Sequence, residues 1–147
     1  MGFIERINVY TDGGSKGNPG AGSIGVVVCD GDNNLLYEFS ECIGHCTNNQ
    51  AEYRALIKGL DLCAKYTRRQ VTAYCDSELV VKQMNGAYRL KNDKLRELYH
   101  KVKDRERVFE TVTYQHVSRS NQRIARADKL LNEAHAGRPT DKRIVGR

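Results

Sequence analysis

The segment from residue 7 to residue 20, INVYTDGGSKGNPG, decides the fold. Its first part, Ile7 to Thr11, is rich in the residues that favour strands, and Asp12 to Gly20 is typical of a loop because it is dominated by Gly, Asn and Pro. Two further strands are predicted at Gly22 to Cys29 and Leu35 to Ile43. Because the connections are short, the three strands should form an antiparallel meander.

Beyond the meander, hydrophobic residues recur alternately at helical and strand spacing. Ala51, Leu56, Leu60 and Cys63 predict a long helix that begins near Thr47 and runs to about residue 65. The later elements are a strand over 71–75 with Asp76 at its end, a short helix from Ser77 to near Gly86, a helix carrying Leu95, Leu98 and Val102, a strand carrying Val112, Tyr114 and His116, and a helix from about Ile124 to Ala136. The order βββαβααβα predicts a single α/β domain with a mixed sheet.

The composition places limits on the class of protein. The chain has 147 residues, of which 39% are hydrophobic and 29% are charged, so one globular domain is expected. No apolar run is long enough to span a bilayer, and residues 1–7 lack the apolar core of a secretory signal. We therefore expect a cytoplasmic protein with no membrane partner, with its domain over residues 1–137 and a basic, disordered tail over residues 138–147.

The charge and the cysteines give weaker indications. A net charge of +6 favours a polyanionic partner but does not distinguish nucleic acid from a membrane surface. The five cysteines are an odd number without a CxxC pair, which favours neither a disulfide framework nor a zinc site. Cys42, His45 and Cys46 are an alternative metal corner, although burial as small hydrophobic residues is the default for cysteine.

Four acidic residues occupy unusual positions. Asp12 and Asp76 each end a predicted strand, Glu52 lies on the face of its helix that should pack against the sheet, and Asp128 is early in the last helix. Any one of them alone could cap a helix or pair with a basic side chain. If the two strands are parallel neighbours, however, Asp12 and Asp76 meet at one edge of the sheet, where ligands commonly bind.

Clustered acids at an apolar edge need compensation by protons or cations, because they repel one another and are costly to desolvate. Mg²⁺ prefers carboxylate and water oxygens and often takes further ligands from substrate phosphates. Two such ions about 4 Å apart can activate a water and stabilise the leaving oxygen in an in-line phosphoryl displacement. The acids therefore indicate metal-dependent phosphoryl chemistry that needs no His or Cys nucleophile.

Four sequence blocks also carry a family resemblance. They are Tyr10-Thr11-Asp12-Gly13-Gly14-Ser15 with Asn18-Pro19-Gly20, Thr47-Asn48-Asn49-Gln50-Ala51-Glu52, Cys75-Asp76-Ser77, and Ala127-Asp128-Lys129-Leu130 with Asn132-Glu133-Ala134. In this order they resemble ribonuclease H type 1 over residues 7–136. The resemblance implies a ribonuclease H-like α/β fold with a five-stranded mixed sheet of order 3-2-1-4-5, flanked by helices.

The resemblance also implies an activity and its cofactor. The expected activity is endoribonuclease cleavage of the RNA strand of RNA/DNA hybrids by a two-metal-ion mechanism that leaves 5′-phosphate and 3′-hydroxyl ends. Mg²⁺ is the expected ion, and Mn²⁺ should substitute for it. The alternatives are additional cleavage of double-stranded RNA, which shares much of the groove shape, and a hybrid-binding module without catalysis. A monomer is expected.

Specific roles follow for residues that match the family blocks. The implied catalytic and metal-binding acids are Asp12, Glu52, Asp76 and Asp128. The implied substrate-binding residues are Gly13, Gly14, Ser15, Gly17, Asn18, Thr47, Asn48 and Asn49. Most of these should meet 2′-hydroxyls along the RNA minor groove, and Thr47 should form part of a pocket for a DNA phosphate. For Asn48 and Asn49, helix capping is the alternative, and both roles could coexist.

The sequence departs from the family pattern in two places. Residues 84–94 lead directly into the next helix, so the basic protrusion that some members use to grip substrate is absent, and affinity must come from elsewhere, such as Arg89 to Arg96 or Arg138 to Arg147. The segment from Arg119 to Asp128 is about two residues longer than the common family spacing. Arg119 is a candidate catalytic residue at the scissile phosphate, and the alternative is a simple surface arginine or a contact to a distant phosphate.

Overall fold

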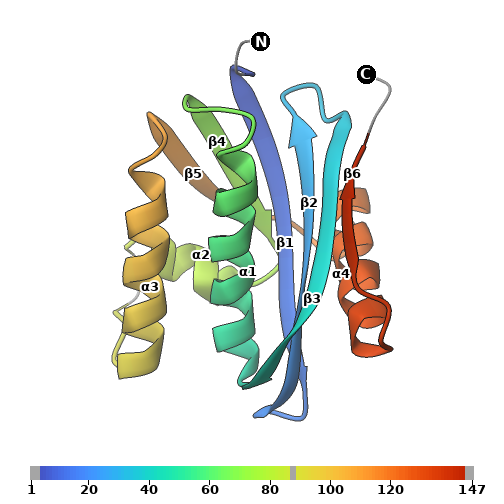
Figure 1. The fold of residues 1–147 in the computed structure, drawn as a ribbon. Coiled ribbons are helices and arrows are strands. Elements are labelled where there is room, and N and C mark those ends of the chain that lie inside the picture. The colour runs from blue at the N-terminus through green and yellow to red at the C-terminus, as the bar shows by residue number, and fades with distance from the viewer. Residues whose placement is uncertain (1–3, 87–88, 145–147) are drawn as a thin grey trace.

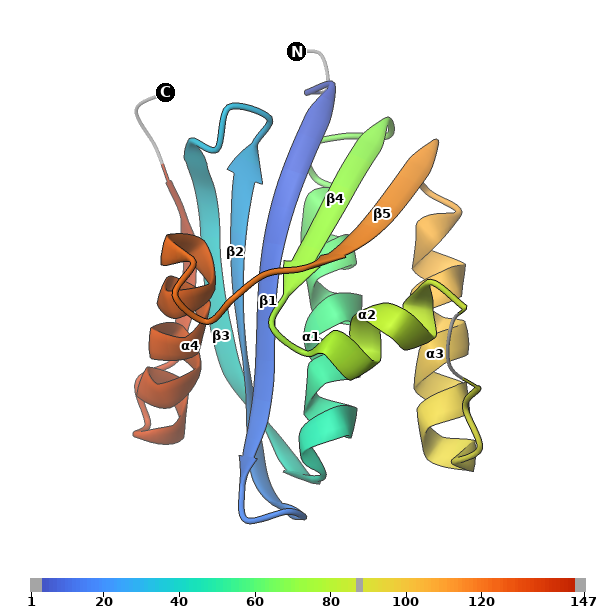
Figure 2. The ribbon, with the colours of Figure 1, turned by 180° about the vertical axis from the view of Figure 1, so that it is seen from behind.

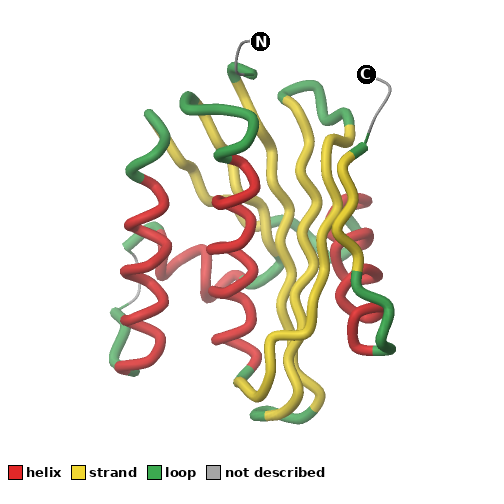
Figure 3. The backbone as a smooth tube through the Cα atoms, in the orientation of Figure 1, coloured by secondary structure: helices red, strands yellow, loops and turns green. Residues whose placement is uncertain are grey.

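The computed structural model describes residues 4–86 and 89–144. In chain order the elements are β1 (Arg6–Lys16), β2 (Gly20–Asp30), β3 (Leu35–Cys46), α1 (Asn48–Cys63), β4 (Gln70–Cys75), α2 (Glu78–Met84), α3 (Asp93–Glu106), β5 (Thr111–His116), α4 (Gln122–His135) and β6 (Thr140–Arg143). The strands form one sheet (Figure 3), and their order across it is β5-β4-β1-β2-β3-β6, as labelled in Figure 1. The predicted order of five strands is therefore confirmed, and a sixth is added beside β3.

The helices cover both faces of the sheet. α1 and α3 lie side by side on one face (Figure 1), and α4 packs on the opposite face against β1, β2 and β3 (Figure 2). Residues of β1 and β2 alternate between these two sides: Val9 and Val26 belong to the cluster under α1, whereas Tyr10 and Val27 belong to the smaller one under α4. This arrangement is the three-layer solution that buries both faces of a sheet.

The strands of the N-terminal hairpin are longer than predicted. The predicted loop from Asp12 to Gly20 is mostly wrong, because β1 continues to Lys16 and pairs with β2 from Ile7↔Asp30 to Lys16↔Ala21. Its glycines serve close packing: a Cβ on Gly13 would lie 2.2 Å from the carbonyl oxygen of Ala51. Gly13 is thus the residue that lets α1 approach the strand, and only Gly17 to Pro19 separate β1 from β2.

The parallel pairing of β1 with β4 determines where the acids lie. Its register runs from Arg6↔Gln70 to Tyr10↔Tyr74, so Asp12 and Asp76 each lie two residues beyond the last pair. The prediction that Asp12 ends its strand is therefore wrong, because β1 continues to Lys16. Asp12 nevertheless lies where β1 and β4 separate. That is the edge at which the sequence predicted the two acids to meet.

The C-terminal segment contains ordered structure. The expectation of a disordered tail is wrong for Thr140–Arg143, which forms β6 and pairs antiparallel with β3 from Ser40↔Thr140 to Tyr37↔Arg143. The backbone N–H of Thr140 also donates to Ser40 Oγ at 3.0 Å, and the Tyr37 hydroxyl donates to the Asp141 carboxylate. The edge of β3 offers free backbone donors and acceptors, and β6 satisfies them. Residues 145–147 of the predicted tail lie outside the described residues.

The structure also bears on three other expectations. α2 ends at Met84 and α3 begins at Asp93, and no further helix lies between them in the described part of the chain, although residues 87–88 of the predicted direct connection lie outside it. All five cysteines are free, and Cys42 donates its S–H to the carbonyl oxygen of Ala134. Among the helices of residues 4–86 and 89–144, none is both long and apolar enough to cross a membrane.

Candidate active site

Three carboxylates converge at the edge where β1 and β4 separate. Asp12 comes from β1, Glu52 is the fifth residue of α1 and Asp76 is the residue after β4. One carboxylate oxygen of each lies within 4.8 Å of the others, and this is the only such group of potential metal ligands in the described residues. Cys42, His45 and Cys46 form no such group, so the alternative metal corner finds no support there.

The N-terminus of α1 fixes the position of Glu52. Thr47 caps the helix by accepting from the N–H of Gln50, while the Gln50 side chain accepts from the N–H of Thr47. The backbone N–H of Gly13 then donates to Glu52 Oε1 at 3.1 Å. Glu52 is thereby tied to the strand that carries Asp12.

Asp128 joins the site from the opposite face of the sheet. It lies on α4, and it lines one hollow together with Asp12, Glu52 and Arg119. Its carboxylate is close enough to Asp12 to help raise the pKa of that residue. Asp128 is outside the tight group of three, and Asn132 donates to its Oδ2 at 3.4 Å. The four predicted acids are thus gathered at one place, three of them in close contact.

The electrostatics of the cluster favour proton or cation binding. Burial, followed by the neighbouring charges of Asp76 and Asp128, raises the pKa of Asp12 from 3.8 to about 8. Burial, followed by the charges of Asp12 and Asp76, raises the pKa of Glu52 well above its usual value, against the opposing hydrogen bond from Gly13. Removing these carboxylates from water therefore leaves a site that is short of positive charge.

Arg119 is the cation nearest to this site among the residues described. Its Nε donates to Asp76 Oδ2 at 2.6 Å, yet its side chain is 79% exposed whereas that of Asp76 is 7% exposed. The structure therefore places Arg119 at the acids rather than at a remote surface. An exposed guanidinium with one hydrogen bond can move easily, so it neutralises the cluster only in part.

All but one of the eight predicted substrate-binding residues line two neighbouring hollows. Gly13, Gly14, Ser15 and Asn48 line the hollow of the acids, and Asn18, Thr47, Asn48 and Asn49 line a second one with Gln50, Asn92 and Leu95. Gly17 lines neither hollow; it lies in the β1–β2 turn with φ of +84°. Thr47 caps α1, so the capping alternative for Asn48 and Asn49 is wrong; the Oδ1 of Asn48 instead accepts from the N–H of Ser15 at 2.9 Å.

Sequence reasoning missed Asn92 in the second hollow. Its side chain caps α3 by accepting from the N–H of Leu95 at 3.0 Å. The signal was available, since Asn is a preferred cap and Asp93 and Leu95 begin the helical pattern. Its approach to Thr47 depends on the packing of α3 beside α1, which no local pattern reveals.

The donor set fits a divalent metal ion. Asp12, Glu52 and Asp76 present oxygen ligands only, which Mg²⁺ and Mn²⁺ prefer over the sulfur and nitrogen ligands of zinc sites. The raised pKa values of Asp12 and Glu52 show that a cation at this place would relieve an electrostatic cost. The open hollow leaves room for water and phosphate ligands.

Comparison with known proteins assigns the family. The family described as reverse transcriptase-like matches residues 10–133, which include all four acids. A ribonuclease HI of Halobacterium salinarum is 38% identical over 129 residues, covering 88% of this chain and 64% of the relative. The chain belongs to the ribonuclease H type 1 family. A bifunctional protein of Mycobacterium tuberculosis is 39% identical over 130 residues, and the chain spans 35% of its length.

Solved structures of ribonuclease H type 1 proteins share the fold. The crystal structure of the Halobacterium salinarum ribonuclease H1 matches with a TM-score of 0.85 and 37% identity, covering 90% of this chain and 98% of that one. The structure of LC11 ribonuclease H1 in complex with an RNA/DNA hybrid matches with a TM-score of 0.81 and 40% identity, covering 89% and 97%. The chain spans from about a third to two thirds of the full-length relatives named above.

Proposed function

We propose that this ribonuclease H type 1 protein is a metal-dependent endoribonuclease that hydrolyses the RNA strand of RNA/DNA hybrids and leaves 5′-phosphate and 3′-hydroxyl ends. The observation that carries the proposal is the convergence of Asp12, Glu52 and Asp76 oxygens within 4.8 Å, with Asp128 beside them. Supporting it, LC11 ribonuclease H1, which is 40% identical, has been solved with such a hybrid.

The four acids would hold the metal ions, Mg²⁺ by preference with Mn²⁺ as a substitute. When bound, these ions lower the pKa of a water molecule and stabilise the charge on the leaving oxygen. The protein contributes geometry: Gly13 holds Glu52 through its N–H, and the capping box fixes the start of the helix that carries Glu52. Arg119, 2.6 Å from Asp76, would offer its guanidinium to a phosphate that enters the site.

Recognition of the RNA strand would use the surface beside the acids. Asn48 Oδ1 already accepts hydrogen bonds from Ser15, so the Asn48 amide NH₂ is the group available to donate to a 2′-hydroxyl. Gly13 and Gly14 let the backbone approach the minor groove closely. The 2′-hydroxyl distinguishes RNA from DNA, so these contacts would select the strand that is cut.

The test is cleavage of end-labelled RNA/DNA hybrid, double-stranded RNA and double-stranded DNA, each with Mg²⁺ or Mn²⁺ and with excess chelator. We expect cleavage of the hybrid alone, dependent on metal, with products that a phosphatase converts from 5′-phosphate to 5′-hydroxyl ends. Cleavage of double-stranded RNA as well would broaden the substrate class. Hybrid binding without cleavage in the presence of either metal would favour the alternative interpretation, a hybrid-binding module without catalysis.

The acting unit is proposed to be a cytoplasmic monomer. The site requires residues of one chain only, because β1, α1, β4 and α4 of the same chain supply its acids. Sedimentation of the purified chain with and without hybrid, and fractionation of cells that produce it, test these two points.

A further inference from the structure

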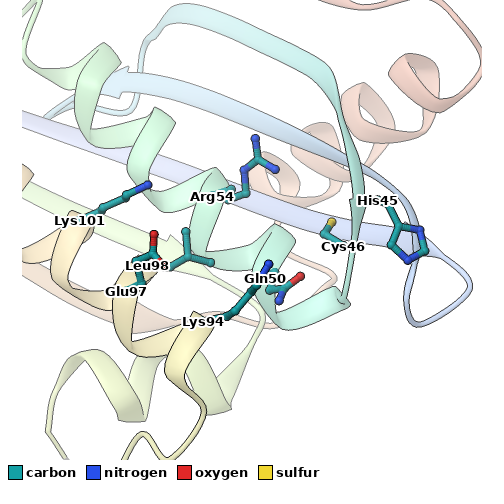
Figure 4. Close-up of a pocket in the computed structure, with 8 residues that line it drawn as sticks. All are labelled: His45, Cys46, Gln50, Arg54, Lys94, Glu97, Leu98 and Lys101. Atoms are coloured by element: carbon teal, nitrogen blue, oxygen red, sulfur yellow. The ribbon is translucent and has the colours of Figure 1, made fainter.

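A second charged hollow lies between α1 and α3, away from the acids. His45, Cys46, Gln50, Arg54, Lys94, Glu97, Leu98 and Lys101 line it (Figure 4). We call it the α1–α3 groove. The close-up shows Lys101 extending from α3 toward α1, Arg54 rising from α1, and Lys94 beside Gln50 at the other end.

The groove concentrates cations that have no acidic partner. Within the residues that the structure describes, no ion pair involves Arg54, Lys94 or Lys101. By contrast, Arg105 and Lys103, also on α3, pair with Asp61 and Glu106. Arg54 uses one N–H for the carbonyl oxygen of Ile43, which leaves further guanidinium donors free. Three unpaired cations against Glu97 therefore favour an anionic ligand.

The lining residues indicate what part of a ligand would be recognised. The groove has no aromatic side chain other than the imidazole of His45 at its edge, so it offers no platform on which nucleobases could stack. Arg and Lys side chains are suited to phosphate oxygens. The ligand is therefore a phosphate backbone, recognised without regard to base sequence.

The groove is continuous with the proposed substrate-binding surface. Gln50 lines both the groove and the hollow that contains Thr47 and Asn49, and Lys94 is adjacent to Leu95 of that hollow. Arg54 lies one helical turn beyond Gln50, a rise of about 6 Å along α1. A strand that passes Thr47 would thus meet Lys94 first and then Arg54 and Lys101.

We propose that the α1–α3 groove binds backbone phosphates of the hybrid beyond the Thr47 hollow and extends the footprint of the enzyme on long substrates. This inference rests on the proposed function, since it takes the hybrid as ligand. The groove would contribute affinity for the hybrid in place of a basic protrusion, since no further helix lies between α2 and α3 in the described residues. Glu97 lies in the same groove and lowers its affinity for the hybrid by repelling phosphate.

The experiment compares two charge-matched double variants in the inactive Asp12→Asn background, so that binding is measured without cleavage. Arg54→Ala/Lys101→Ala removes two groove cations, and Arg69→Ala/Arg107→Ala removes two exposed arginines outside both hollows and the groove. Fluorescence anisotropy gives Kd for a labelled hybrid of about 30 base pairs and for a shorter one that covers only the acids and the Thr47 hollow.

The double variant Arg54→Ala/Lys101→Ala, the groove pair, should raise Kd for the long hybrid on the order of tenfold at about 0.1 M salt. It should also reduce the magnitude of the slope of log K against log salt by roughly 2. The control pair should change neither quantity, and Kd for the short hybrid should respond much less to the groove pair. Glu97→Gln should strengthen binding of the long hybrid. Equal effects of the two double variants, or no effect of either, would overturn the proposal.

Two measures keep the outcome decisive. Arg54 and Lys101 are exposed, as are Arg69 and Arg107, so both double variants should fold, and thermal unfolding of each checks this directly. Cleavage by the otherwise unaltered chain is measured in parallel. If that chain cleaves hybrid while the groove variant binds like the control, the groove alone is refuted; if it fails to cleave while the groove effect persists, the proposed reaction is refuted instead.

Discussion

Asp12 and Glu38 are two buried carboxylates in neighbouring parts of one sheet, and they have opposite pKa shifts. Glu38 on β3 accepts two hydrogen bonds from Arg126, at 2.7 and 2.9 Å, and this lowers its pKa. Asp12 on β1 is 3% exposed, and burial beside Asp76 and Asp128 raises its pKa to about 8. Both neighbours, Arg126 and Asp128, come from α4, two residues apart.

The difference separates an acid that stabilises the fold from an acid that the fold leaves uncompensated. A bidentate guanidinium satisfies Glu38 within the protein, so nothing further is needed there. Asp12 receives another acid from the same helix, an arrangement that costs stability unless a cation enters. Strongly perturbed acids beside an open hollow are typical of functional sites, and this contrast is what identifies the edge between β1 and β4.

The largest effect should come from Asp12→Asn. The change keeps the side-chain volume but removes a charged carboxylate that we propose as a metal ligand, so hybrid cleavage should fall by at least about a thousandfold. Because a buried and uncompensated charge is also removed, the metal-free protein should become more resistant to urea at neutral pH. Turnover at saturating metal near that of the unaltered chain would remove Asp12 from the site.

Glu38→Gln should have the opposite profile. Loss of one partner leaves Arg126 without its bidentate acceptor, and the free energy of unfolding should fall by about 2 kcal/mol, roughly a thirtyfold shift in the unfolding equilibrium. Turnover at a temperature where the variant is folded should stay within about twofold. Glu41→Gln, on the same strand but exposed, is the control and should be neutral in urea unfolding.

A third substitution tests Arg119, the cation that partly neutralises the acids. Arg119 donates one hydrogen bond to Asp76 and is 79% exposed, whereas the side chain of Arg126 is 36% exposed and donates two. If Arg119 acts at the reacting phosphate, Arg119→Ala should lower kcat about tenfold with little change in KM. Arg119→Lys should restore part of that loss. An unchanged kcat with a raised KM would make Arg119 a substrate contact only.

The smallest effect expected is a pH dependence of metal-free stability. Asp12 has a raised pKa, so its stabilising contribution is complete below pH 4 and is lost as the pH rises toward about 8. Glu38 has a lowered pKa, so its contribution is present above its unfolded pKa and is lost as the pH falls. In excess chelator the melting temperature of the unaltered chain should therefore fall by several degrees relative to Asp12→Asn between pH 5 and pH 8.

Magnesium should remove most of that decline. A cation compensates the charge that burial disfavours, so the ion should raise the melting temperature more at pH 8 than at pH 5. Equal stabilisation at both values, or none in Asp12→Asn and the unaltered chain alike, would contradict the assignment of the acids as metal ligands.

The sequence predicted the acids better than it predicted their surroundings. Asp12, Glu52 and Asp76 stand where hydrophobic patterns begin or end, and such boundaries can be recognised locally. The bond between Glu38 and Arg126 joins residues 88 positions apart, so only the packing of α4 on β3 reveals it. The α1–α3 groove was missed for the same reason, because its cations come from two helices that meet only in the fold.

The fold was predictable to a similar degree. Side-chain patterns gave every helix and the first five strands, whereas the order of those strands in the sheet was implied by the family resemblance. They failed from Asp12 to Lys16, where glycines that resemble a loop instead permit close packing against α1. They failed again at Thr140–Arg143, which has no alternation of apolar residues, because main-chain hydrogen bonds to β3 hold this strand.

The pairing of β6 with β3 also bears on solubility. β3 carries Tyr37 and Phe39 along the stretch that β6 covers, and an uncovered edge with such residues is a template on which a strand of another molecule can add. β6 is only four residues long and brings Asp141, Lys142 and Arg143 to the outside of the sheet. Those charges make the new edge a poor template, so this short strand protects the molecule against edge-to-edge aggregation at high concentration.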